Sequence, residues 1–190
     1  MAEQDLSIDE ILDTKQSFTD SVTIALTGDV AHKLSRLREE VDRAQMRLDS
    51  RLGSSDDIAA YEDAKRRLEE AIEEAKEAGQ TATFTFKALG RQEFEDLRDA
   101  EPATKEQRNE YRKMALAQGV PPSKVGTLGY NPDTFPPVLI AASCVKPTMN
   151  LEQAQRLWNS EKFSQSELQV LFATAYGVNA ADTRVDLGED

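Results

Sequence analysis

The segment NPDTFPPVLIAASCVKP, residues 131–147, is the most apolar stretch of a chain that is otherwise dominated by charge. Its paired prolines suit the first turn of a helix, where their missing N–H groups cost nothing. Asp133 or Thr134 can cap that helix, and Pro147 is expected to stop it. A helix that is apolar nearly all round is buried on several sides. The segment therefore predicts the central helix of a small helical module.

Two amphipathic segments that follow are expected to cover this central helix. Residues 150–161, NLEQAQRLWNSE, begin with Asn150 as a predicted N-cap, and residues 164–179 read SQSELQVLFATAYGVN. A further helix is predicted over residues 91–100, RQEFEDLRDA, and a short polar one over residues 104–119. The side chains predicted to face inward from the two covering helices are Leu151, Ala154, Leu157, Trp158, Leu168, Leu171, Phe172, Ala175 and Tyr176.

The first half of the chain alternates between two kinds of periodicity. Residues 17–29, SFTDSVTIALTGD, and residues 81–89, TATFTFKAL, alternate apolar and polar side chains, as strands with one buried face do. Between them, apolar residues recur at steps of three and four in two stretches separated by RLGSSDD, which predicts an antiparallel helical hairpin. The two apolar stripes are Val30, Leu34, Leu37, Val41, Ala44 and Leu48, and then Ile58, Tyr61, Leu68, Ile72 and Ala75.

These patterns together predict a mostly α (α+β) fold. A two-stranded antiparallel β element brackets a long antiparallel helical hairpin and is followed by a C-terminal helical module. The expected boundaries are a flexible N-terminal arm over 1–17, the strand–hairpin–strand unit over 18–89, the helical module over 90–179 and a disordered acidic tail over 180–190. Because an isolated strand pair is only marginally stable, it needs helices against it or a strand from a partner subunit, which points toward a homo-oligomer.

The charge of the chain argues against two classes of partner. The 190 residues carry a formal net charge of −12. Such a surface repels nucleic acid phosphates and anionic membranes, because binding to them needs clustered Lys and Arg. The chain shows neither a signal peptide nor an apolar run long enough to span a membrane. We therefore expect a soluble, cytosolic protein that binds neither nucleic acid nor membrane.

Residue types that carry out reactions are scarce in this sequence. His32 is the single histidine and Cys144 the single cysteine, so multi-histidine and thiolate metal sites and internal disulfides are not expected. Cys144 lies in an apolar run, where it is expected to pack as a small hydrophobe. The many carboxylates alternate with Lys and Arg at helical spacing, which is typical of a solvated face. The sequence predicts a protein that is not an enzyme and that has no cofactor.

Three segments in order resemble a known family. They are TFKALGRQEFEDLRDAEPATKEQ (85–107), NPDTFPPVLIAASCVKP (131–147) and ELQVLFATAYGVN (167–179). Their succession of strand, Leu-Gly-Arg helix start, Pro-Pro helix and closing helix is similar to the tail assembly chaperones of long-tailed (siphovirus-type) bacteriophages, especially phages of actinobacteria. The resemblance covers about residues 20–180 and is strongest over 83–179. The sequence departs from the family at EPAT (101–104), where two prolines and a threonine are more usual, and in its acidic tail.

The resemblance implies a non-catalytic role in phage tail assembly. Members of that family coat the apolar, helical tape measure protein and keep it soluble until tail tube subunits polymerise around it. The implied partners are the tape measure protein, a longer frameshifted form of the chain and the major tail tube protein. The implied location is the host bacterial cytoplasm, with absence from the mature virion. The candidate residues for the cargo groove, each of which can equally be core, are Phe135, Leu139, Trp158, Phe163, Leu171 and Phe172.

Two alternatives belong to other classes of function. The chain can be a structural virion component, such as a tail or head-tail connector protein. It can also be an acidic DNA mimic that inhibits a host nuclease, although the basic residues interleaved along the hairpin argue against an uninterrupted negative face.

Overall fold

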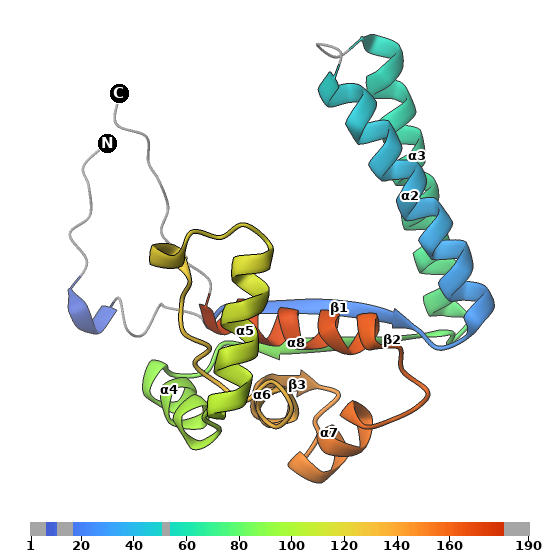
Figure 1. Ribbon diagram of the computed structural model, residues 1–190. Helices are drawn as coiled ribbons and strands as arrows, with labels where there is room; N and C mark the ends of the chain where they lie inside the picture. Colours follow the sequence, from blue (N-terminus) through green and yellow to red (C-terminus); the bar gives the residue numbers. More distant parts are fainter. Residues whose placement is uncertain (1–6, 11–16, 51–53, 181–190) are drawn as a thin grey trace. The chain divides into compact units, whose positions relative to one another are not determined.

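The computed structural model describes residues 7–10, 17–50 and 54–180. Helices make up 65% of these residues, and a three-stranded antiparallel sheet has the order β1-β2-β3 (Figure 1). The predicted mostly α (α+β) class is therefore confirmed. Most of the predicted N-terminal arm and almost all of the predicted acidic tail lie outside the described residues.

Contacts divide the chain into two compact units. One unit consists of residues 23–83, and the other combines residues 1–22 with residues 84–190. The division falls inside β1 (Thr19–Ala25) and β2 (Thr81–Lys87), so each of these strands contributes residues to both units.

The first unit is a helical hairpin of α2 (Gly28–Ser50) and α3 (Ser55–Glu77), which lie side by side in Figure 1. The antiparallel register is marked by two ion pairs between the helices: Lys33 with Glu74 at 2.9 Å and Arg67 with Glu40 at 3.0 Å. The predicted seam of α2 is confirmed, with Leu34, Leu37 and Ala44 buried.

The predicted seam of α3 is confirmed at Leu68, Ile72 and Ala75, but it contains more alanine than predicted. Its buried residues are Ala64, Ala71 and Ala75, and Ile58 is 48% exposed. Steps of three and four run from Tyr61 through Ala64, Leu68 and Ala71 to Ala75, so Ile58 lies beside the seam rather than on it. Alanine on one helix lets the larger leucines of the other approach closely, since the two surfaces must fill the space between them at native density.

Both helix ends of α3 have identifiable caps. Ser54 is the N-cap, and its hydroxyl accepts a hydrogen bond from the Asp57 N–H. At the other end Gly79 has a φ of 65°, a left-handed conformation that glycine adopts without the steric cost of a side chain. These caps satisfy backbone groups that the helix itself leaves unpaired.

The sheet gains a strand that the sequence analysis did not predict. β3 (Cys144–Lys146) pairs antiparallel with β2, with Thr85 opposite Lys146 and Phe86 opposite Cys144. The predicted helix, which was expected to continue until Pro147 stops it, is therefore too long, because α6 spans Phe135–Ser143. A residue that precedes proline is driven away from helical dihedrals, and the extended backbone before Pro147 finds its hydrogen-bond partners on β2.

The second unit is built around α6. This helix packs against α4 (Arg91–Ala100), α7 (Leu151–Trp158) and α8 (Gln165–Ala180), and Figure 1 shows it nearly end-on between α4 and α7. The predicted central helix is thus confirmed, although α4 as well as the two later helices covers it. Between α4 and α6 the chain forms α5 (Lys105–Ala117) and a 3₁₀ turn, η1 (Pro122–Lys124).

The prolines at the start of α6 occupy the predicted place. Pro136 and Pro137 fall in its first turn and are buried, whereas Thr134 stands at the N-cap position without a side-chain capping bond. Asn150 caps α7 in a reciprocal capping box with Gln153, as its sequence position predicted. Leu151 is 44% exposed, so the inward face of α7 begins one turn later, at the fully buried Ala154.

We expect the alanine seam of the hairpin to be sensitive to added volume. Ala71→Leu puts three extra carbons against α2 and should destabilise the hairpin by about 1–3 kcal/mol, the usual cost of overpacking. Ala59 is exposed on the same helix, so Ala59→Leu should change stability by less than about 0.5 kcal/mol. Urea denaturation followed by far-UV circular dichroism measures both. Equal stabilities of the two variants would show that the seam is not tightly packed.

Candidate functional site

The interior of the helical module is an aromatic cluster centred on Phe135. The Phe135 ring is fully buried and lies edge-on to Phe94 and Phe172, with centroid separations of 6.3 and 6.2 Å. Tyr130 stacks at a tilt on Phe135 at 4.9 Å, and Tyr176 lies 5.9 Å from Tyr130. Edge-to-face contacts of this kind add to the free energy gained by burial. The cluster joins α4, the segment before α6, α6 itself and α8.

A polar cluster fixes the chain just before α6. The Asn131 N–H donates to the Glu101 carbonyl at 2.7 Å, and its side-chain oxygen accepts from Gln107 and from the Asp133 N–H, both at 2.9 Å. The Thr134 hydroxyl donates to the Glu101 carboxylate. The junction of α4 and α5, residues 101–104, therefore holds residues 131–134, from which α6 starts.

A separate pair of hydrogen bonds ties α8, the last helix of the module, to the residues that follow β2. The Leu89 N–H donates to the Asn179 side-chain oxygen at 2.8 Å, and the Asn179 amide donates to the Ala175 carbonyl at 2.8 Å. Asn179 therefore satisfies the Leu89 N–H, a backbone group that lies outside the helices and strands, while its amide is held on its own helix.

The structure separates the six predicted cargo residues into two groups. Phe135, Leu139 and Leu171 are fully buried, so they are core residues and offer no surface to a partner. Trp158, Phe163 and Phe172 are half-buried. Trp158 meets Phe172 at 6.3 Å and Phe172 meets Phe135 at 6.2 Å, which brings three residues of the predicted set, one each from α7, α8 and α6, into contact.

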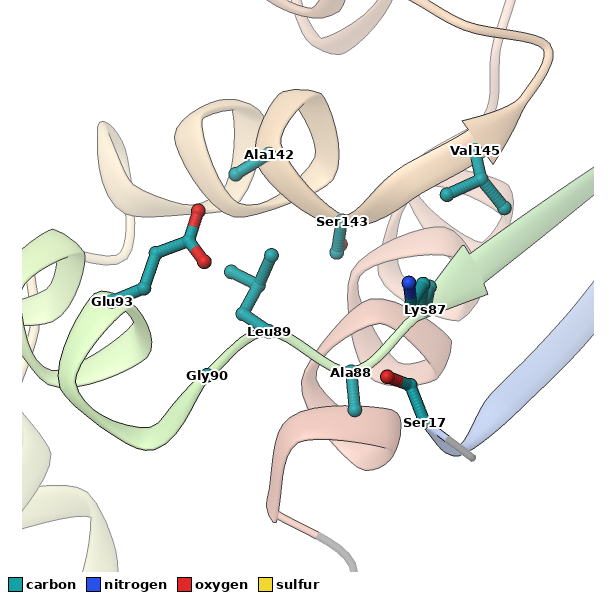
Figure 2. Close-up of a pocket in the computed structure, with 9 residues that line it drawn as sticks. All are labelled: Ser17, Lys87, Ala88, Leu89, Gly90, Glu93, Ala142, Ser143 and Val145. Carbon is teal, nitrogen blue, oxygen red and sulfur yellow. The ribbon is translucent and has the colours of Figure 1, made fainter. Parts of the chain in front are cut away.

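A small pocket of about 250 Å³ lies where β2 runs into α4. Figure 2 shows Leu89 and Glu93 directed toward the end of α6, where Ala142 and Ser143 form the opposite wall. The Ser143 hydroxyl is buried and donates to the Leu139 carbonyl at 2.7 Å, so its proton is already engaged. Nucleophilic catalysis needs a base to activate such a hydroxyl. The lining residues of this pocket do not display that pairing.

Two titratable groups of the module have shifted pKa values. Burial raises the pKa of the Tyr130 hydroxyl, and the neighbouring Tyr176 and Tyr111 raise it further. Burial also raises the pKa of the Cys144 thiol, whose sulfur donates to the Pro147 carbonyl at 3.2 Å. Both groups are therefore held in their neutral form, and Cys144 packs as the small hydrophobe that the sequence predicted.

Within residues 7–10, 17–50 and 54–180, no group of three or more His, Cys, Asp or Glu side chains is placed to hold a metal ion. None of the helices in those ranges is both long and apolar enough to cross a membrane.

Comparisons with protein-family models, with curated proteins and with solved structures found no significant match to this chain.

Sequence reasoning missed the polar cluster before α6, although one signal for it was present. Thr104 and Gln107 stand three residues apart ahead of a helix, and they form a reciprocal capping box. The same Gln107 amide then reaches Asn131. Capping boxes are visible in a sequence, but the second contact joins segments far apart in the chain and depends on the tertiary fold.

We expect a buried residue of α6 and an exposed residue of α5 to differ in their effect on stability. Leu139→Ala removes a fully buried side chain and should cost about 2–5 kcal/mol in the free energy of unfolding. Met114→Ala on the exposed surface of α5 should cost less than about 0.5 kcal/mol. Thermal and urea denaturation compare the two. A Leu139→Ala protein as stable as the parent would contradict the placement of α6 at the centre.

The Cys144 thiol should react slowly while the protein is folded. Its raised pKa lowers the thiolate fraction, and burial limits access, so a disulfide reagent at pH 8 should label it far faster in denaturant than in buffer. Since the folded pKa exceeds the ordinary value of 9.0, the thiol's contribution to stability is present below pH 9.0 and declines above it. Cys144→Ala should lose less stability than the parent between pH 9 and 10. Equal labelling rates would contradict the burial.

Proposed function

We propose that this protein is a tail assembly chaperone of a long-tailed bacteriophage. In this proposal it binds the tape measure protein non-catalytically and keeps it soluble while the tail tube assembles. Its place is the host cytoplasm, and it is absent from the mature virion. A longer frameshifted form of the chain and the major tail tube protein are its further partners.

The observation that carries the proposal is the convergence of the segments in which the resemblance lies. The Leu-Gly-Arg start of α4 is bonded to Asn179 near the end of α8 through the Leu89 N–H. EPAT is bonded to NPDT through Glu101 and Asn131. The Pro-Pro helix meets the closing helix through Phe135 and Phe172. The segments that carry the resemblance therefore contact one another within one folded module. This is expected when the conserved pattern of a family belongs to a single domain.

The rim of the aromatic cluster supports a role in binding an apolar cargo. Trp158, Phe163 and Phe172 are half-buried, so each keeps part of its side chain available to solvent. An amphipathic helix docks on such a surface through apolar residues spaced three and four apart. The buried members of the set, Phe135 among them, then act by positioning the rim.

The charge of the chain supports the same role. A formal net charge of −12 opposes non-specific aggregation by electrostatic repulsion, and added Asp and Glu favour solubility more than added Lys and Arg do. An assembly of an apolar cargo coated with such chains carries that charge on its outside, which opposes aggregation.

Co-expression with the tape measure protein of the same genome tests the proposal. The soluble fraction of the tape measure protein should rise when this chain is present, and the two should co-purify on a tag placed on this chain. Trp158→Ala should weaken recovery of the cargo roughly tenfold, the loss typical of an aromatic anchor. Met114→Ala removes an exposed apolar side chain from α5 and serves as the matched control, which should leave recovery unchanged.

A second measurement distinguishes a tail assembly chaperone from a structural virion component. Mass spectrometry of purified phage particles should not find this chain at the level of tail proteins. An insoluble tape measure protein with no co-purification, together with near-stoichiometric amounts of this chain in particles, would instead identify a structural virion component.

A further inference from the structure

The outer edge of β1 has no role in the proposed function. The strand order places β2 between β1 and β3, so β1 is an edge strand in the part of the chain that the structure describes. Natural edge strands are usually protected by lysines, prolines or bulges. The seven residues of β1, TDSVTIA, contain one charge, Asp20, and neither lysine nor proline.

The hydrogen bonds to β2 determine which backbone groups point outward. The Ala88 N–H donates to the Phe18 carbonyl at 2.8 Å, and the Leu26 N–H donates to the Gln80 carbonyl at 2.8 Å. In an antiparallel pair, alternate residues direct their backbone groups toward the partner strand. The residues between, which direct theirs to the outer edge, are Thr19, Ser21, Thr23 and Ala25. The Asp20 carboxylate accepts the Ser21 N–H at 2.7 Å and so covers one of these donors.

We propose that β1 pairs antiparallel with β1 of a second copy of this chain, with Val22 of one copy opposite Val22 of the other. In this register the Ser21 N–H leaves the Asp20 carboxylate, and Ser21 exchanges backbone hydrogen bonds with Thr23 of the second copy. Thr19 does the same with Ala25. The register uses the outward-facing groups and leaves the bonds to β2 intact. The partner is a second copy because the edge is complementary to itself, as a two-fold symmetric interface requires.

Two exposed apolar side chains select this register. Phe18 is 43% exposed and Leu26 is 54% exposed, and they stand at the two ends of β1, on the same side as Val22 and Ile24. Pairing about Val22 places Phe18 of each copy opposite Leu26 of the other. A slip of one copy by two residues breaks both of these apolar pairs, and in one direction it sets Leu26 against Asp20.

The positions of the Asp20 carboxylate and of the Ser21 and Thr23 hydroxyls are compatible with the same register. Asp20 lies opposite Ile24 of the second copy, and the two Asp20 side chains are roughly 14 Å apart along the strands, so like charges do not face each other. On the other side of the strand, Ser21 already meets Thr85 and Thr23 meets Thr83, each at 2.9 Å between hydroxyl oxygens. Ser21 opposite Thr23 of the second copy continues this row of hydroxyls.

The pairing does not depend on the proposed function, and a proline substitution tests it. Thr23→Pro removes an outward N–H and no bond to β2, whereas Thr23→Val keeps that N–H. Both variants lose the hydroxyl contact to Thr83, so Thr23→Val is the matched control. Sedimentation velocity over a concentration series should show a dimer for the parent and for Thr23→Val, and dimerisation weakened roughly tenfold or more for Thr23→Pro.

Disulfide cross-linking tests the register directly, and it does not require that the Thr23→Pro variant folds. In a Cys144→Ser background, Val22→Cys places two thiols opposite each other in a closely spaced pair, so mild oxidation should give a covalent dimer. Asp20→Cys in the same background separates the thiols by four residue positions and should not cross-link. A parent chain that is monomeric at all concentrations, a dimer unaffected by Thr23→Pro when that variant is folded, or equal cross-linking of the two cysteine variants would each overturn the proposal.

Discussion

The helical module depends on the burial of one short helix. α6 has nine residues, too few to be stable alone in water, because an isolated helix of that length cannot offset the cost of nucleation. Phe135, Leu139 and Ile140 are fully buried, and each such side chain contributes about 1.5–3 kcal/mol when it leaves water. α4, α7 and α8 each pack on this helix, so their positions follow from the need to cover it.

The helical hairpin is stabilised in a different way. Its seam joins leucines of α2 to alanines of α3, and the larger α3 side chains Leu68 and Ile72 pack against it only partly buried. The ion pairs along its surface are solvent-exposed, and pairs of that kind contribute about 0–1 kcal/mol each. Caps at Ser54 and Gly79 therefore matter more in the hairpin than similar features do in a well-packed core.

The distinction between core and rim bears on how the protein can recognise a partner. A fully buried side chain contacts a partner only after the core opens, which costs much of the stability of a small domain. A half-buried side chain such as Trp158 contacts a partner without that cost. The resemblance to tail assembly chaperones indicated a region of the chain, and burial then divided its apolar residues into fully buried and half-buried ones.

The sequence by itself determined the type and order of most elements, the seam of α2, the capping of α7 and the central place of α6. These follow from local rules, since periodicity, capping boxes and proline positions act within a few residues. Only the tertiary structure decided that the chain leaves α6 at Ser143 to form β3, that Asn131 and Asn179 hold distant segments, and that Phe135, Leu139 and Leu171 are core whereas Trp158 is rim. Each of these depends on which surfaces meet, because burial and long-range hydrogen bonds belong to pairs of segments and no single segment carries them.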